Sequence, residues 1–143
     1  MMMNSTMQMM QMHAKDMAMQ DVDMAMLQDC IEACSACEQA CTMCASCMMG
    51  DEAGGAMHME MCMNTADVCN TMMRMMMRPA GMHVESMMAM LSATIMLSNA
   101  CAEECTKHAD MHEDCKMCAE VCRQCAVACQ KVMDAMRSMM PMS

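Results

Sequence analysis

Residues 115–129 read CKMCAEVCRQCAVAC, a segment in which successive cysteines are separated by steps of 3, 4, 3 and 4 residues. Steps that alternate between three and four keep side chains on one face of an α-helix. Lys116, Glu120 and Arg123 fall between the cysteines and form an outer polar face. The spacing therefore predicts a helix whose thiols point into a helical bundle.

A second segment repeats this pattern. Residues 30–47 carry cysteines at steps of 4, 3, 4, 3 and 3, and two shorter pairs lie between the long stripes. The candidate metal-binding thiols are Cys30, Cys34, Cys37, Cys41, Cys44, Cys47, Cys62, Cys69, Cys101, Cys105, Cys115, Cys118, Cys122, Cys125 and Cys129. Such regular stripes indicate a shared interior of sulfur atoms.

The rest of the chain favours an all-α fold. It has 35 Met, 4 Gly, 2 Pro and no aromatic residue, so good helix formers dominate and strand formers are scarce. We expect helices at 16–49, 56–77, 83–108 and 111–139, with Asp110 and Glu113 forming a capping box before the last one. Short connections predict an antiparallel up-down-up-down four-helix bundle over residues 16–143. Residues 1–15 are a Met-rich, low-complexity N-terminal arm.

Charge and hydropathy narrow the classes of function. The formal net charge of −10, with eight scattered basic residues, argues against nucleic acid binding. The longest uncharged stretch, 86–102, contains several Ser and Thr residues, so we expect no membrane span. The first twenty residues lack the pattern of a signal peptide, but a trimmed exported protein would look the same. Cytoplasmic and exported locations both stay open.

Three interpretations of the thiols compete. Isolated buried cysteines behave as small hydrophobes, but two unbroken stripes are too regular for that role. Disulfides require Cβ atoms about 3.8 Å apart, whereas neighbours on a helix surface are about 5–6 Å apart. An odd number of cysteines, 15, would also leave one unpaired. Metal binding is the interpretation that we favour.

The charge balance favours copper among the metals. Zinc takes four ligands per ion, so 15 thiolates would hold roughly four Zn²⁺ and leave about seven buried negative charges. Iron–sulfur motifs of closely spaced cysteines lie in loops. Cu(I) is soft and monovalent, and thiolates select it. One Cu(I) per thiolate keeps the interior near neutral, which predicts a non-enzymatic Cu(I) store that holds many ions.

Two alternatives remain open. A zinc-buffering protein of the metallothionein type would use the same thiols. A thiol redox protein would need an activated cysteine of low pKa near a helix N-terminus or a cation, and the stripes run through helix interiors without such selectivity.

The segments CIEACSACEQACTMC (30–44) and CAEECTKHADMHEDCKMCAEVCRQCAVAC (101–129) resemble the bacterial copper storage proteins. The resemblance covers roughly residues 27–133 and rests on the cysteine spacing. It implies a homotetramer of four-helix bundles, each filled with Cu(I) bound mainly by cysteines at i, i+3 or i+4. Helices two and three carry fewer thiols than that family often has.

The two ends of the predicted bundle differ in composition. All the thiols fall in the half near the connections around residues 50–55 and 108–112. The other half holds the thioethers of Met24, Met26, Met72, Met73, Met76, Met87, Met90, Met133 and Met136, which we expect to pack rather than to bind. Met48, His58, His108 and His112 are further candidate ligands at the thiol-rich end. The resemblance implies that His and Met near this opening contribute to copper binding, and His108 and His112 match its KH…H pattern.

Overall fold

The computed structural model describes residues 5–12, 23–47 and 55–138. Its helices are α1 (Ser5–Met12), α2 (Met24–Cys47), α3 (Gly55–Met76), α4 (Val84–Lys107) and α5 (Glu113–Arg137). A short 3-10 helix at Pro79–Gly81 joins α3 to α4. These three ranges contain no strand, so the predicted all-α class is confirmed.

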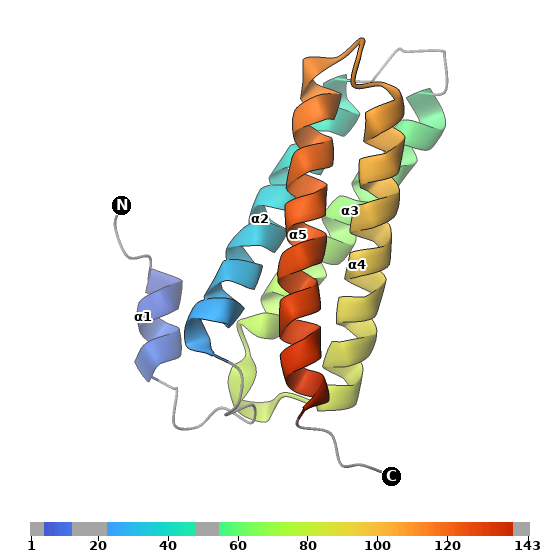
Figure 1. Cartoon of the computed structure of the whole chain (residues 1–143). Coiled ribbons are helices and arrows are strands. Elements are labelled where there is room, and N and C mark those ends of the chain that lie inside the picture. The colour runs from blue at the N-terminus through green and yellow to red at the C-terminus, as the bar shows by residue number, and fades with distance from the viewer. Residues whose placement is uncertain (1–4, 13–22, 48–54, 139–143) are drawn as a thin grey trace.

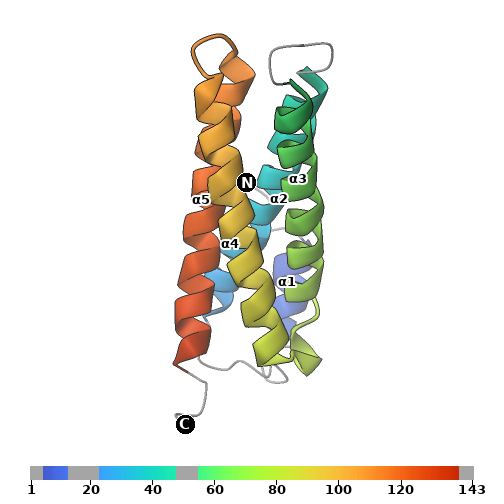
Figure 2. The ribbon, with the colours of Figure 1, turned by 90° about the vertical axis from the view of Figure 1, so that its right-hand side faces the viewer.

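The four long helices form an antiparallel bundle. Helix α2 packs against α3 and α5, and α4 packs against the same two helices, so each helix has two neighbours in a closed ring. Figures 1 and 2 show successive long helices running in opposite directions, with the α4–α5 turn at one end of the bundle and the α3–α4 connection at the other. The predicted up-down-up-down topology is therefore confirmed.

Two capping hydrogen bonds and one proline explain where three of the helices begin or end. Asp23 precedes α2 and accepts a hydrogen bond from the Ala25 backbone N–H at 3.0 Å, as an N-cap residue does. His83 caps α4 by accepting from the Ser86 N–H at 3.3 Å. Pro79 follows shortly after α3 and cannot continue it, because its ring occupies the place of the amide proton.

Two predicted boundaries differ from the structure. Helix α5 begins at Glu113 after the N-cap residue His112, so the predicted capping box at Asp110 is wrong. Asp110 lies instead in a turn in which the His108 carbonyl accepts from the N–H groups of Met111 and His112. The arm contains a helix, α1, and the predicted start near residue 16 lies outside the described residues.

The end of the core next to the α3–α4 connection is apolar and lies beyond the last buried thiols, Cys30, Cys69 and Cys129. Its buried side chains are Leu27, Met72, Met76, Met87, Leu91, Val132, Met133 and Met136. Unbranched methionine side chains adapt their shape and fill the space that aromatic residues usually occupy. Three buried hydroxyl residues, Thr65, Thr94 and Ser98, line the interior farther along α3 and α4. Apolar side chains thus fill this end of the bundle and can stabilise it in the absence of metal.

The N-terminal helix lies beside the Met-rich half of the bundle (Figures 1 and 2). Met10 is buried, while Met9 and Met12 are exposed. A pocket of about 380 Å³ separates part of α1 from residues Met77–Gly81. Contact with the bundle therefore runs through Met10, and most of the α1 surface that the structure describes faces solvent.

Helix α4 has the length and composition of a membrane-crossing segment. Its most apolar window has a mean hydropathy of 1.2, and 28% of that window is buried. It is also a core helix, because Met87, Leu91 and Cys101 face the interior between α3 and α5. One such helix is weak support for a span, and the expected absence of a membrane span stays a prediction.

Candidate metal centre

The thiols gather along the axis of the bundle. Every cysteine except Cys47 is buried, and all are free thiols. Sulfur and nitrogen atoms within 4.8 Å of one another form the groups Cys30–Cys34–Cys129, Cys37–Cys69–Cys125, Cys41–Cys101–Cys118–Cys122, Cys62–Cys101–Cys105–Cys118 and Cys44–His58–Cys62–Cys105. Cys62, Cys101, Cys105 and Cys118 each belong to two of these groups and so join three of them. The other two are joined by Cys34–Cys125 at 3.8 Å and Cys37–Cys122 at 3.7 Å, so the array is continuous.

The closest thiol pairs lie between helices rather than within one. Cys30 Sγ is 3.6 Å from Cys129 Sγ, and Cys41 Sγ is 3.6 Å from Cys122 Sγ, both between α2 and α5. Pairs within one helix, such as Cys37 with Cys41 on α2 and Cys118 with Cys122 on α5, are 3.9 Å apart. Two sulfurs bound to one ion at about 2.3 Å stand about 4 Å apart when the angle is trigonal. Helices α2 and α5 are therefore spaced so that one ion can bridge them.

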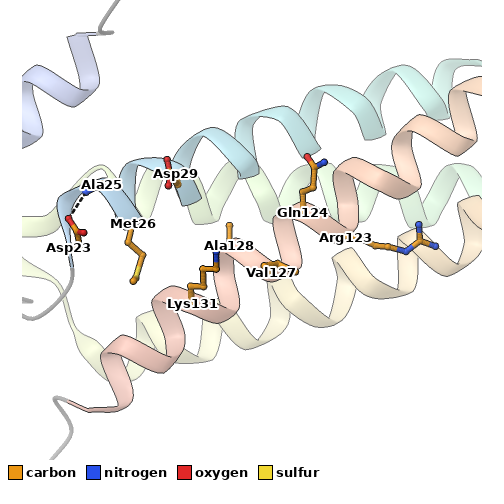
Figure 3. A pocket seen from close by; sticks show the side chains of 9 residues that line it. All are labelled: Asp23, Ala25, Met26, Asp29, Arg123, Gln124, Val127, Ala128 and Lys131. Atoms are coloured by element: carbon orange, nitrogen blue, oxygen red, sulfur yellow. Dashed lines mark hydrogen bonds between the residues drawn. The ribbon is translucent and has the colours of Figure 1, made fainter.

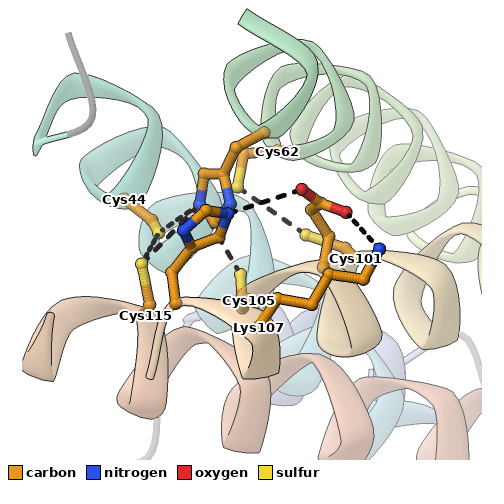
Figure 4. Close-up of polar contacts among 9 residues, drawn as sticks. Cys44, Cys62, Cys101, Cys105, Lys107 and Cys115 are labelled. Carbon is orange, nitrogen blue, oxygen red and sulfur yellow. Dashed lines mark hydrogen bonds and ion pairs between the residues drawn. The ribbon is translucent and has the colours of Figure 1, made fainter. Parts of the chain in front are cut away.

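An imidazole completes the array at the α4–α5 turn. His58 is 0% exposed, and its Nε2 lies 3.2 Å from Cys44 Sγ. Cys105 Sγ and Cys115 Sγ lie 3.9 and 3.8 Å from the same nitrogen. Figure 4 shows Cys44, Cys62, Cys105 and Cys115 pointing toward a common centre from the four helices. His58 therefore offers a nitrogen donor among thiols.

A second histidine separates His58 from solvent. The His108 ring meets the His58 ring edge to face, with centroids 4.9 Å apart. His108 Nε2 is 3.6 Å from Glu104 Oε1, and the other oxygen of that carboxylate pairs with Lys107 at 3.2 Å. His112 is half-buried at the start of α5. Met48 lies outside the described residues.

Hydrogen bonds between thiols divide them into acidic and weakly acidic members. The hydrogen bond with Cys129 is the main cause that lowers the pKa of Cys30 to about 5. The hydrogen bond with Cys105 does the same for Cys44, whose pKa falls to about 6. The pKa of Cys34 is raised, chiefly by its hydrogen bond with Cys125. A metal ion entering the array displaces the protons that the thiols carry.

Cys47 departs from the predicted interior stripe. It occupies the last position of α2 and is exposed, so it does not line the core as the other thiols do. A hydrogen bond with the Asp114 carboxylate is the main cause that raises its pKa. The spacing could not reveal this exposure, because burial at the end of a helix depends on the elements opposite it and not on periodicity.

This exposure predicts selective labelling. In the reduced, metal-free protein, one equivalent of a maleimide should modify Cys47 first, because the buried thiols react only when the bundle opens. The raised pKa of Cys47 means that its rate at pH 7 should be below that of free cysteine and should rise with pH. Peptide mass spectrometry identifies the modified residue. Cys47→Ser should remove the fast phase, and a fast phase that persists would contradict the assignment.

Exposed methionines surround the same end. Met43, Met57, Met111 and Met117 are all more than half exposed and lie on the last turns of α2, the first turns of α3 and α5, and the α4–α5 turn. His83, by contrast, is exposed at the opposite end, where it caps α4. Soft sulfur donors therefore stand both outside and inside the bundle at the thiol-rich end.

A groove of about 500 Å³ follows the surface between α2 and α5. Figure 3 shows it lined by side chains of mixed charge, among them Asp29, Arg123 and Lys131. No thiol lines it, so the groove is separate from the sulfur array.

A helical bundle with a continuous interior of free thiols defines a class of protein that binds several thiophilic metal ions in a buried array. The family model described as copper storage protein matches residues 23–134. The chain belongs to the copper storage protein family, and its function is to store Cu(I) ions on thiolates that line the bundle core.

Solved structures agree with this assignment. The copper storage protein of Streptomyces lividans loaded with 10 copper equivalents is 37% identical, with a TM-score of 0.77 over 80% of this chain and 88% of that one. A histidine-to-alanine variant from the same organism is 36% identical, with a TM-score of 0.77 over 80% and 98% of the two chains. A five-copper structure, described as a cytosolic copper storage protein, is 37% identical, with a TM-score of 0.74 over 77% and 93%. A search of curated proteins found no match.

Proposed function

We propose that the fourteen buried cysteines and His58 are the storage ligands of this protein, and that His108, His112 and Met48 form the entrance for Cu(I). The observation that carries this proposal is the continuous interior array, in which neighbouring groups share thiols or have thiols within 3.8 Å of each other. Shared thiolates let each sulfur bridge two ions, so Cu(I) is held by two or three sulfurs while the charge stays balanced.

The described part of the core contains no Lys or Arg side chain that could balance the charge of thiolates. The buried polar side chains of the described residues are Gln28, His58, Thr65, Thr94 and Ser98, and none of them is a permanent cation. A thiolate array without a counter-ion is costly to bury. Monovalent copper, at about one ion per thiolate, supplies the missing positive charge, which accounts for storage of many ions.

The entrance is proposed at the α4–α5 turn. Exposed thioethers there capture Cu(I) as neutral soft ligands, and half-buried imidazoles stand between them and the thiols. His108 contacts His58, whose Nε2 already lies near three sulfurs. A Cu(I) ion can therefore move inward by exchanging one ligand at a time. It stays bound to the protein at every step. Cys47, exposed at the same end, is assigned to capture rather than to the store.

A thiol redox function is disfavoured by the same geometry. A redox cysteine needs a low pKa together with access to its substrate. Cys30, Cys37 and Cys44 have lowered pKa values of about 5, about 6 and about 6, but all three are buried. The exposed Cys47 has a raised pKa. Acidity and access therefore do not coincide at these thiols, and we assign no enzymatic activity.

We infer the oligomeric state and the cellular compartment of this protein from its relatives. The family resemblance supports a homotetramer, and Met63, Met96 and Val127 leave apolar surface exposed on α3, α4 and α5 for contact between copies. The solved relative described as cytosolic supports a cytoplasmic store.

Anaerobic titration of the reduced protein with Cu(I), against a competing chelator, tests the proposal. We expect saturation at about 10–20 ions per chain, from roughly one ion per thiolate. Apparent affinity should fall as the pH falls, because more thiols then carry protons that copper must displace. Saturation at four ions or fewer, with Zn(II) bound in equal number and affinity, would instead support a zinc buffer.

A further inference from the structure

The quartet at the thiol-rich end of the bundle differs from the other metal-binding groups in one donor. Cys44 on α2, His58 and Cys62 on α3, and Cys105 on α4 have their donor atoms within 4.8 Å of one another. All four residues are buried. The four other groups named above are built from cysteine alone. Three thiolates with one imidazole, closed to water, are a donor set of structural zinc sites.

The spacing of these donors also suits zinc. A tetrahedral ion with bonds of about 2.3 Å to sulfur and about 2.0 Å to nitrogen places those donors about 3.6 Å apart. His58 Nε2 lies 3.2 Å from Cys44 Sγ and 3.9 Å from Cys105 Sγ, which brackets that value. His58 and Cys62 are four residues apart on one helix and therefore share a face. Little movement would be required to enclose an ion.

Charge separates this quartet from the groups of four cysteines. Zinc with four thiolates carries a net charge of −2, and zinc with three thiolates and a neutral imidazole carries −1. No Lys or Arg is buried among the described residues, so every additional negative charge in the core is uncompensated. An ion in the histidine quartet also removes Cys62 and Cys105 from the neighbouring group of four cysteines.

We propose that, in the absence of copper, Cys44, His58, Cys62 and Cys105 form a single Zn(II) site that fastens α2, α3 and α4 together at the entrance of the store. Binding of one Zn²⁺ replaces up to three thiol protons, which leave to solvent, and the imidazole binds through Nε2. The inference goes beyond copper storage, because the site takes a second metal of different charge and geometry. Incoming Cu(I), favoured by the wider array, displaces the zinc.

Titration of the reduced, metal-free chain with Zn(II) alone tests this site. We expect one equivalent to bind much more tightly than any further ions, with release of up to three protons per ion. X-ray absorption of the one-equivalent sample should show three sulfurs at about 2.3 Å and one nitrogen at about 2.0 Å. Co(II) in place of zinc should give the visible bands of a tetrahedral thiolate site.

His58→Ala should weaken this first equivalent by at least about 100-fold, more than the loss of a merely supporting residue. Cys69→Ser is the matched control, since it removes a buried thiol of α3 outside the quartet and should leave zinc affinity unchanged. A shell of four sulfurs in the wild-type protein would overturn the proposal, even if His58→Ala failed to fold. Several equal zinc sites, or an unchanged affinity in folded His58→Ala, would overturn it as well. Copper capacity is measured separately, so these failures would leave the storage function intact.

Discussion

Replacing Cys118 and Cys122 together by serine is expected to lower the Cu(I) capacity by about two to four ions, given roughly one ion per thiolate and the bridging role of each sulfur. Cys118 belongs to two of the interior groups, and Cys122 lies 3.6 Å from Cys41 on the facing helix. A serine hydroxyl is a hard donor that Cu(I) does not select. The loss should therefore exceed that of any two thiols at the edge of the array.

The measurement is anaerobic chelator-monitored stoichiometry, with circular dichroism to confirm that the helices remain. Cys47→Ser is the control, because it removes a thiol outside the buried array and should cost one ion at most. If the double variant lost no more copper than this control, the central groups would not be the store.

The second large effect concerns stability. Leu91→Ala removes a fully buried apolar side chain from the core and should lower the free energy of unfolding by about 2–5 kcal/mol. A leucine side chain has no atom that can bind a metal ion, so copper capacity should stay unchanged at a temperature where the variant is folded.

Urea unfolding of the metal-free reduced protein measures this loss. Leu97→Ala, at a partly exposed position of the same helix, is the matched control and should cost clearly less. A Leu91→Ala variant that is as stable as the control would show that Leu91 does not stabilise the core. A variant that loses several copper ions would show that Leu91 also affects the metal site.

The sequence predicts most of this fold because its cysteines serve as markers of the interior. Their alternating spacing fixes which face of α2 and α5 is buried, and Pro79 fixes where α3 ends. The prediction that all thiols lie in one half of the bundle is wrong, because Cys30, Cys69 and Cys129 lie in the halves of their helices nearer the α3–α4 connection. Periodicity is reliable here because one buried stripe runs through each of these two helices.

Features that depend on three-dimensional packing escape the same reasoning. Periodicity assigns Cys47 to the interior, but it lies at the last position of α2 and is exposed, because burial at a helix end depends on what lies opposite. His58 was expected at the opening, yet it is fully buried, because the α3 face that carries Cys62 four residues later faces inward. The four-residue separation of His58 and Cys62 is the sequence pattern that could have predicted this burial. The close pairs of thiols between α2 and α5 depend on the distance between the two helices. The spacing of cysteines within one helix does not predict that distance.

The hydroxyl residues of α3 and α4 have an evolutionary consequence. Thr65, Thr94 and Ser98 are buried in the same interior, and Ser98 Oγ has no hydrogen-bond partner among the described residues. Serine and cysteine differ by one atom and by a single nucleotide change in suitable codons. Storage capacity in such a bundle can thus drift upward or downward by point mutation, while the apolar half preserves the fold. Lineages exposed to different copper supply can tune the size of the store without inventing a new scaffold.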